Sequence, residues 1–149
     1  MIEKARIGDP PHIRDLIRQY AIRERMLPRS LNSIFDALRD FHVCREGQKV
    51  VGCCALHITW TGLVELRSLA VAPEASGRGI GTRLVEQCLA EARELAAERI
   101  FVLTYLPGFF ARFGFEECGK DELPHKVWAD CIHCPKFPDC DEVAMILRL

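Results

Sequence analysis

The sequence predicts an α/β (α+β) fold, in which helices flank a mixed and mostly antiparallel sheet within a single domain. Segments whose apolar residues recur at helical spacing alternate along the chain with segments rich in β-forming residues. Three of the β-rich segments follow one another with only short turns between them, which is typical of an antiparallel meander. The chain has 149 residues, the length of one domain, and no linker or repeat divides it.

The N-terminal region is predicted to form a strand and two helices. Residues 2–7 form the strand, and Asp9 followed by two prolines predicts the start of the first helix. Its apolar residues recur at helical spacing: Ile13, Leu16, Ile17 and Tyr20. Residues 27–30 break this pattern, and Ser30 can cap a second helix that runs through Leu38.

The meander occupies the middle of the chain. We predict strands over residues 41–45, 49–60 and 63–71, because these runs are rich in β-branched and apolar residues. Gly47 and Gly62 lie in the short turns between them.

The second half is predicted to alternate helices and strands. A long helix carries one buried stripe, whose members are Leu84, Val85, Cys88, Leu89, Ala92, Leu95 and Ala96. Residues 100–104 form an apolar strand, and Pro107 opens a short helix that Gly114 ends. Further strands are predicted from Phe115 and over residues 143–149.

Composition excludes several classes of partner. Lys and Arg number 20 and Asp and Glu number 21, so the net charge of −1 gives no basic surplus for nucleic acid or an anionic membrane. No apolar run is long enough to span a bilayer, and the first residues do not resemble a signal peptide. We therefore expect a cytoplasmic protein whose eight cysteines are reduced thiols.

The most informative segment is the turn at residues 77–81, which follows a strand and opens the long helix. Its three glycines at alternate positions let the backbone fold tightly and approach a ligand. Unpaired N–H groups and the dipole at a helix start favour phosphate, and Arg78 adds a positive charge. A P-loop would have Lys after Gly81, where Thr82 stands, and the glycine spacing is not that of a dinucleotide-binding turn. A turn without a ligand is the alternative.

The turn Arg-Gly-Ile-Gly at 78–81, followed by a long helix, an apolar strand and Phe-Phe-Ala-Arg-Phe-Gly-Phe at 109–115, resembles the GNAT acyltransferase superfamily. The resemblance implies one N-acetyltransferase domain over residues 1–149, with a sheet that splays apart at the acetyl-CoA site. It implies that acetyl-CoA is held by Leu69, Ala70, Val71, Ser76, Gly77, Arg78, Gly79, Ile80, Gly81, Thr82 and Phe110. Ser76 departs from the family, which usually has Gln or Arg there.

A narrower resemblance is to short-form N-acetylglutamate synthases. It rests on MLPRS (26–30), ELRSLAV (65–71), LTY (103–105), LPHKVW (123–128) and the closing CIHCPKFPDCDE (131–142). The resemblance implies transfer of the acetyl group of acetyl-CoA to L-glutamate, the first step of arginine biosynthesis. Both substrates are small molecules.

Acetyl transfer to an amine requires that the ammonium lose a proton and that the oxyanion be stabilised. Glu65 resembles the family's general base, and the alternative is an ion pair with Arg67 on the same strand face. Phe110 stands where many family members have a Tyr that acts as the general acid, so Tyr105 is the candidate for that role. The alternative for Tyr105 is a packing role, since a thiolate can leave without an acid.

Glutamate brings two carboxylates, for which Arg is the natural partner. The candidate substrate-binding residues are, in order, Arg67, Arg29 and Lys126, together with Ser68. Arg29 and Lys126 can equally be solvated surface charges. His57 lies in an apolar strand, where a core or rim position is the more ordinary role.

The segment 119–142 is rich in Cys, His, Pro and Trp. Cys131, Cys134 and Cys140 are a weak candidate for a tetrahedral zinc site, because a second Cys-x-x-Cys pair is missing. We expect reduced cysteines in a packed loop and no metal.

Two other functions stay open at this point. One keeps the fold and changes the acceptor to another amino acid, a small amine or a protein N-terminus. The other is an acyl-CoA-binding sensor or a metal-binding interaction module without turnover, which Ser76 and Phe110 keep open. The sequence leaves the oligomeric state undetermined, with a homodimer as one alternative.

Overall fold

The computed structural model describes residues 1–21, 28–123 and 142–149. The chain forms two compact units, one built from residues 1–57 and 66–95 and the other from residues 58–65 and 96–149. Within the described residues, no helix has both the length and the apolar content needed to cross a membrane.

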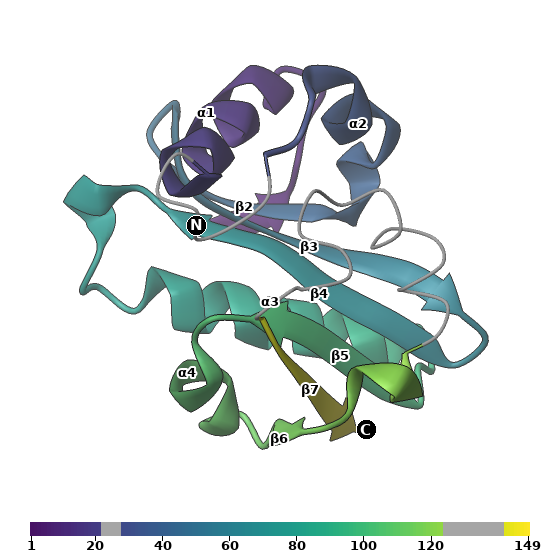
Figure 1. The fold of residues 1–149 in the computed structure, drawn as a ribbon. Coiled ribbons are helices and arrows are strands. Elements are labelled where there is room, and N and C mark those ends of the chain that lie inside the picture. The colour runs from purple at the N-terminus through teal and green to yellow at the C-terminus, as the bar shows by residue number, and fades with distance from the viewer. Residues whose placement is uncertain (22–27, 124–141) are drawn as a thin grey trace. The chain divides into compact units, whose positions relative to one another are not determined.

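The first unit contains most of the predicted meander and three helices. Its strands are β1 (Ile2–Lys4), β2 (Phe41–Glu46), β3 (Lys49–Trp60, as far as His57) and the later part of β4 (Leu63–Val71). Its helices are α1 (Pro10–Ala21), α2 (Leu31–Asp36) and α3 (Ile80–Glu94). In this unit α1 and α2 lie on one side of the strands and α3 on the other (Figure 1). Neighbours β1 and β2, and β2 and β3, pair antiparallel.

The second unit begins with the first residues of β4 and continues with β5 (Arg99–Thr104), α4 (Pro107–Ala111), β6 (Glu116–Glu117) and β7 (Val143–Arg148). Strands β4 and β5 pair parallel over three residues, ending at the Glu65–Phe101 pair, although β4 continues to Val71. Strand β7 pairs antiparallel with β5 and with β6. The core of this unit consists of Leu63, Phe101, Leu123 and Ala144.

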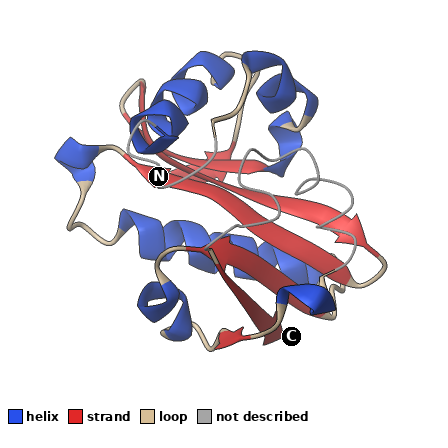
Figure 2. Cartoon of the chain, viewed as in Figure 1, coloured by secondary structure: helices blue, strands red, loops and turns tan. Residues whose placement is uncertain are grey.

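The predicted fold class is confirmed. Seven strands of the described residues form a mixed sheet in the order β1-β2-β3-β4-β5-β7-β6, with helices beside it (Figure 2). The bounds predicted for β3 and β4 agree with the structure. The strand predicted from Phe115 is real but short, since β6 covers only two residues.

The strand predicted over residues 2–7 is shorter than expected, because β1 ends at Lys4 and Ile7 is exposed. The backbone N–H of Arg6 donates to the carboxylate of Asp9 at 2.7 Å, which turns the chain out of the sheet towards α1. Asp9 was predicted to cap α1 through its side chain. The carboxylate instead accepts from Arg6 and Arg45, while the Asp9 carbonyl accepts the first helical bonds as at any helix start.

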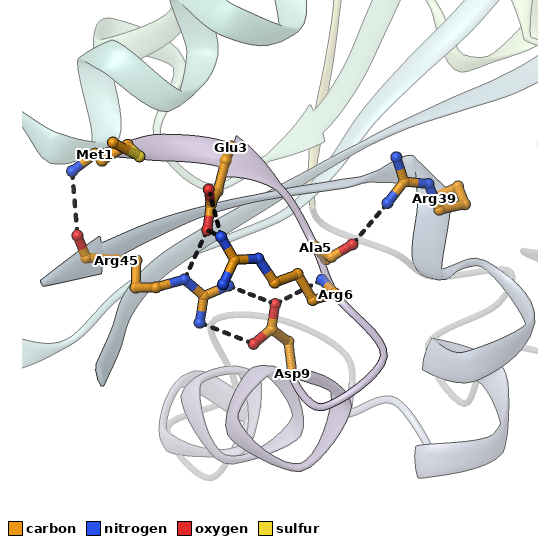
Figure 3. A network of polar contacts seen from close by, with 7 residues as sticks. All are labelled: Met1, Glu3, Ala5, Arg6, Asp9, Arg39 and Arg45. Carbon is orange, nitrogen blue, oxygen red and sulfur yellow. Dashed lines mark hydrogen bonds and ion pairs between the residues drawn. The ribbon is translucent and has the colours of Figure 1, made fainter. Parts of the chain in front are cut away.

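The Asp9 carboxylate is bound by a guanidinium from β2 (Figure 3). Arg45 Nη1 and Nη2 donate to its two oxygens at 3.0 and 2.8 Å, and Arg45 Nε donates to Glu3 at 2.7 Å. Hydrogen bonding by Arg45 lowers the pKa of Glu3. Burial tends to raise the pKa of Asp9, but the bonds from Arg45 and Arg6 outweigh it and lower that pKa. One arginine thus ties β1, β2 and the start of α1 together.

Helix α3 lies directly on β3 because β3 contains a glycine at the contact. A Cβ on Gly52 would stand 3.0 Å from Ile80 Cγ2 and 3.1 Å from Leu84 Cδ1. Farther along the helix, Glu91 accepts from Lys4 Nζ at 2.9 Å and pairs with the buried His42 at 3.1 Å. These contacts fix the position of the first turn of α3, where the candidate site lies.

Candidate functional site

The candidate site is built on the later part of β4 and the turn into α3, both in the first unit. Ser68 has a φ of +58°, the left-handed region that a residue with a side chain rarely adopts. This conformation interrupts the regular alternation of the strand, so the strand faces assumed for Glu65 and Arg67 do not continue past Ser68. Backbone strain of this kind is concentrated at functional sites.

Two thiols of β3 contact this part of β4. Cys53 Sγ donates to the Ser68 carbonyl at 3.4 Å, and Cys54 Sγ donates to the Arg67 carbonyl at 3.8 Å. Burial raises the pKa of Cys53 to about 12 and raises that of Cys54 well above its usual value. Both side chains are therefore neutral hydrogen-bond donors at neutral pH, which suits a carbonyl partner.

The end of β4 is fixed from two sides. Tyr20 of α1 donates its hydroxyl to the Val71 carbonyl at 2.6 Å, and the Ala72 N–H donates to the Val51 carbonyl at 2.8 Å. Sequence reasoning placed Tyr20 only in the apolar stripe of α1 and missed this contact. A phenol at the end of an apolar stripe is the one signal that could have suggested it.

The turn itself exposes backbone. Gly77 and Gly79 have φ angles of +80° and +75°, and a Cβ added at either meets no atom of the described residues within 4 Å. Gly79 caps α3, and its carbonyl accepts from the Arg83 N–H at 3.1 Å. The first N–H groups of α3, from Ile80 onward, have no partner within the helix. Open backbone at a fifteen-residue helix start fits a phosphate group.

The side chains of the turn are engaged with protein groups. Ser76 Oγ donates to the Pro73 carbonyl at 2.8 Å, within the 3-10 turn that precedes it. Arg78 Nη1 and Nη2 donate to the Glu46 carboxylate at 2.9 and 3.0 Å. The guanidinium that sequence analysis placed beside the phosphate is therefore held by the last residue of β2.

The candidate substrate arginines differ in their surroundings. Arg29 is half-buried, with its guanidinium 5.4 Å from the centre of the Phe41 ring and Nη2 donating to the Ser33 carbonyl at 3.3 Å. Arg67 and Ser68 are half-buried on β4. His57, expected at a core or rim position, is 38% exposed and pairs with Asp40 at 2.7 Å.

The candidate catalytic residues belong to the second unit. Glu65 is only 2% exposed and stands opposite Phe101 of β5. Tyr105 is half-buried and directly follows β5. Phe110 is buried, and its ring contacts Phe109 and Phe115 edge-on with centroid distances of 5.1 and 5.6 Å.

Several predicted residues lie outside the described residues. They are Lys126, Cys131, Cys134 and Cys140. In the part of the chain that the structure describes, no group of three His, Cys, Asp or Glu side chains could hold a metal ion. The cysteines of that part are free thiols: Cys44, Cys53, Cys54, Cys88 and Cys118.

Comparison with known proteins agrees with this geometry. The model of the acetyltransferase (GNAT) family matches residues 11–115. An uncharacterized N-acetyltransferase of Chlorobaculum tepidum is 41% identical over 148 residues, which cover 99% of this chain and 96% of the relative. An amino-acid acetyltransferase of Mycobacterium tuberculosis is 41% identical over 120 residues, covering 78% of this chain and 68% of the relative.

A solved structure resembles the whole chain. It is the N-acetylglutamate synthase of Neisseria gonorrhoeae in complex with coenzyme A and N-acetyl-glutamate, with a TM-score of 0.89 and 29% identity. The match covers 100% of this chain and 35% of that protein, so this chain corresponds to about a third of the synthase. Because the family model spans most of the chain and the relatives match it closely, the protein belongs to the GNAT family of acetyltransferases.

Proposed function

We propose that this protein transfers the acetyl group of acetyl-CoA to the α-amine of L-glutamate, giving N-acetyl-L-glutamate. The family match and the amino-acid acetyltransferase relative support an acetyl-CoA-dependent amino-acid N-acetyltransferase, and the proposal adds glutamate as the acceptor. The observation that supports the finer proposal is the resemblance of this whole chain to about a third of a synthase whose structure is a complex with coenzyme A and N-acetyl-glutamate.

The pyrophosphate of coenzyme A is assigned to the turn at residues 77–82. Two left-handed glycines hold the backbone open there, and the N–H groups and dipole of α3 favour the negative charge. The pantetheine arm and the thioester are assigned to the backbone of residues 69–71, whose N–H groups are the candidate donors to the oxyanion. Ser76, where the family usually has Gln or Arg, stabilises the start of the turn by donating to the Pro73 carbonyl.

Transfer forms a carbon–nitrogen bond and breaks the carbon–sulfur bond of the thioester. Only the neutral amine attacks, and an alkyl ammonium has a pKa of roughly 9–10, so a base is useful at neutral pH. We assign the proton to the carboxylate of Glu65. Sulfur leaves with the bonding electrons as thiolate, and Tyr105 is the candidate donor of a proton to it.

The carboxylates of glutamate are assigned first to Arg67 and then to Arg29. Both are half-buried arginines of the first unit, and a guanidinium binds a carboxylate through two parallel hydrogen bonds. Ser68 is the candidate polar contact beside Arg67. Lys126 is the third candidate for binding a carboxylate of glutamate.

An acceptor panel tests the proposal. Thiol release from acetyl-CoA is measured with glutamate, with other amino acids and small amines, and with a peptide N-terminus, and the products are identified by mass spectrometry. We expect release that requires glutamate and yields N-acetyl-glutamate. Release with another amine but not with glutamate would replace the acceptor. If no acceptor caused release, an acyl-CoA-binding sensor would be the better description.

A further inference from the structure

Two ion pairs join the residues that flank the β2–β3 turn to the segment 74–78, which leads into and includes part of the glycine turn. Glu46 accepts from Arg78 at 2.9 and 3.0 Å, and Lys49 donates to Glu74 at 2.6 Å. All four side chains are at least 44% exposed and belong to the first unit. The two pairs therefore offer the same kind of contact, with the acid on opposite sides of the junction.

The Glu46–Arg78 pair differs from the other because of where Arg78 stands. Its neighbours Gly77 and Gly79 both have left-handed backbone, so Arg78 lies in the middle of the segment to which we assign the pyrophosphate. Glu74 lies before that segment, in the 3-10 turn at residues 73–75. This step rests on the proposed function, in particular on the place of coenzyme A.

Arg78 presents the Nη1–Nη2 edge of its guanidinium to Glu46. Nη1 and Nη2 each donate to a different carboxylate oxygen, the parallel two-bond geometry that arginine also forms with phosphate. The same two N–H groups cannot serve both anions at once. A pyrophosphate that gains this edge of Arg78 must displace the Glu46 carboxylate.

We propose that Glu46 is an internal competitor for Arg78, which coenzyme A displaces when its pyrophosphate binds the turn. The competitor lowers affinity for coenzyme A and for acetyl-CoA alike, because both carry the same pyrophosphate. An exposed ion pair contributes little to stability, and the effect on binding is correspondingly modest. We expect about a threefold change in the dissociation constant.

The variant that tests this is Glu46→Gln, with Glu74→Gln as its matched control. Both substitutions remove one negative charge from the same junction and break one ion pair, but only the first frees Arg78. Titration calorimetry with coenzyme A at constant ionic strength should give about threefold tighter binding for Glu46→Gln. Glu74→Gln should stay within 1.5-fold of the wild type.

A double-mutant cycle with Arg78→Gln decides whether the gain passes through Arg78. The cost of Arg78→Gln should be about threefold larger in the Glu46→Gln background than in the wild type. Equal costs in the two backgrounds, or equal gains for Glu46→Gln and Glu74→Gln, would overturn the proposal. 3′-Dephospho-coenzyme A, which keeps the pyrophosphate, should show the same gain, and a loss of the gain with this probe would overturn the assignment to pyrophosphate.

Failure of the proposed function gives a different result. Gly79→Asp, which places a carboxylate in the turn, should weaken coenzyme A binding in every background if the turn is the site. If Gly79→Asp leaves binding unchanged, the site lies elsewhere and the proposed function loses its turn. If Gly79→Asp weakens binding while the cycle is additive, the site stands and only the competition by Glu46 is wrong.

Discussion

Three residues of the candidate site, Ser68, Gly77 and Gly79, have positive φ angles. The sequence predicts the tight turn at residues 77–81, because only glycine adopts positive φ readily. Ser68 adopts the same region, but a serine in a β-rich run gives no signal for it in the sequence. The Arg78–Glu46 pair leaves no local signal either, because it joins residues 32 positions apart in the sequence.

Glu65 is the residue whose assigned role has the clearest kinetic signature. Glu65→Gln keeps the shape of the buried side chain and removes its ability to accept a proton. We expect kcat to fall ~10²-fold, within the range for a positioned base. The pH–rate profile should rise at higher pH, because the reaction then depends on amine that is already neutral.

The profile is measured from pH 6 to 10, with Tyr105→Phe as a companion that removes only a hydroxyl. A Glu65→Gln enzyme with the wild-type kcat and profile would transfer the role of base to His57 or to a water relay. If Tyr105 donates a proton to sulfur, Tyr105→Phe should lower kcat with KM for acetyl-CoA nearly unchanged.

Among the elements, those with strong periodicity were predicted almost to the residue, whereas the ends of elements were not. Strands β3 and β4 agree with their predicted bounds because the turns between them carry glycine. Strand β1 is shorter because a long-range partner, Arg45, holds the Asp9 carboxylate that the sequence assigned to a local cap. Local rules cannot anticipate a competitor from another strand.

The start of α1 should therefore respond to acid. Arg45 and the Arg6 N–H lower the pKa of Asp9, so its stabilisation is present above the unfolded value near 4 and is lost as pH falls through the lower folded value. Arg45→Gln should lower the free energy of unfolding at pH 7 by about 2 kcal/mol, the scale of a hydrogen bond to a charged group.

Urea unfolding between pH 7 and pH 3 measures this effect, and Arg39→Gln is the control. Arg39 donates to the Ala5 carbonyl at 2.8 Å in the same region, and among the described residues it forms no ion pair with a carboxylate (Figure 3). The control should keep the wild-type dependence on pH, whereas Arg45→Gln should flatten it. A steep acid loss that survives in Arg45→Gln would mean that other carboxylates dominate.

The first turn of α3 gives a second prediction at this scale. Gly79→Asp puts a carboxylate where phosphate is assigned, at an open left-handed position that Asp tolerates, so affinity for coenzyme A should fall more than tenfold, about 1.4 kcal/mol, with the fold intact. Gly79→Asn has nearly the same shape and tolerates the left-handed backbone without the charge. Calorimetry should find a clearly smaller loss for Asn, and equal losses would point to strain in place of charge.

For the whole molecule, the fold class and the family were both accessible from the sequence, because the motifs are spread from the first strand to the last. The hydrophobic pattern of the sequence does not show where the boundary between the two compact units falls. Strand β4 runs through both compact units, and the break falls between Glu65 and Leu66, inside an uninterrupted β-rich run. Pairing across strands, which decides such a boundary, leaves no local trace.

Ligand binding should be visible in the stability of the molecule. A ligand that binds only the folded state at 100 times its dissociation constant raises the free energy of unfolding by about 2.7 kcal/mol. We expect this increase with coenzyme A, measured by denaturant unfolding. Gly79→Asp at the same ligand concentration should lose about half of it or more, whereas Glu74→Gln should keep it.

The buried thiols of β3 have a chemical consequence for a protein that handles thioesters. Cys53 and Cys54 contact the carbonyls of Ser68 and Arg67, on the strand to which the acetyl donor is assigned. Both side chains are fully buried. Only the thiolate is nucleophilic, and burial raises both pKa values far above neutral pH. The thiols of Cys53 and Cys54 are therefore inert towards a thioester bound beside β4.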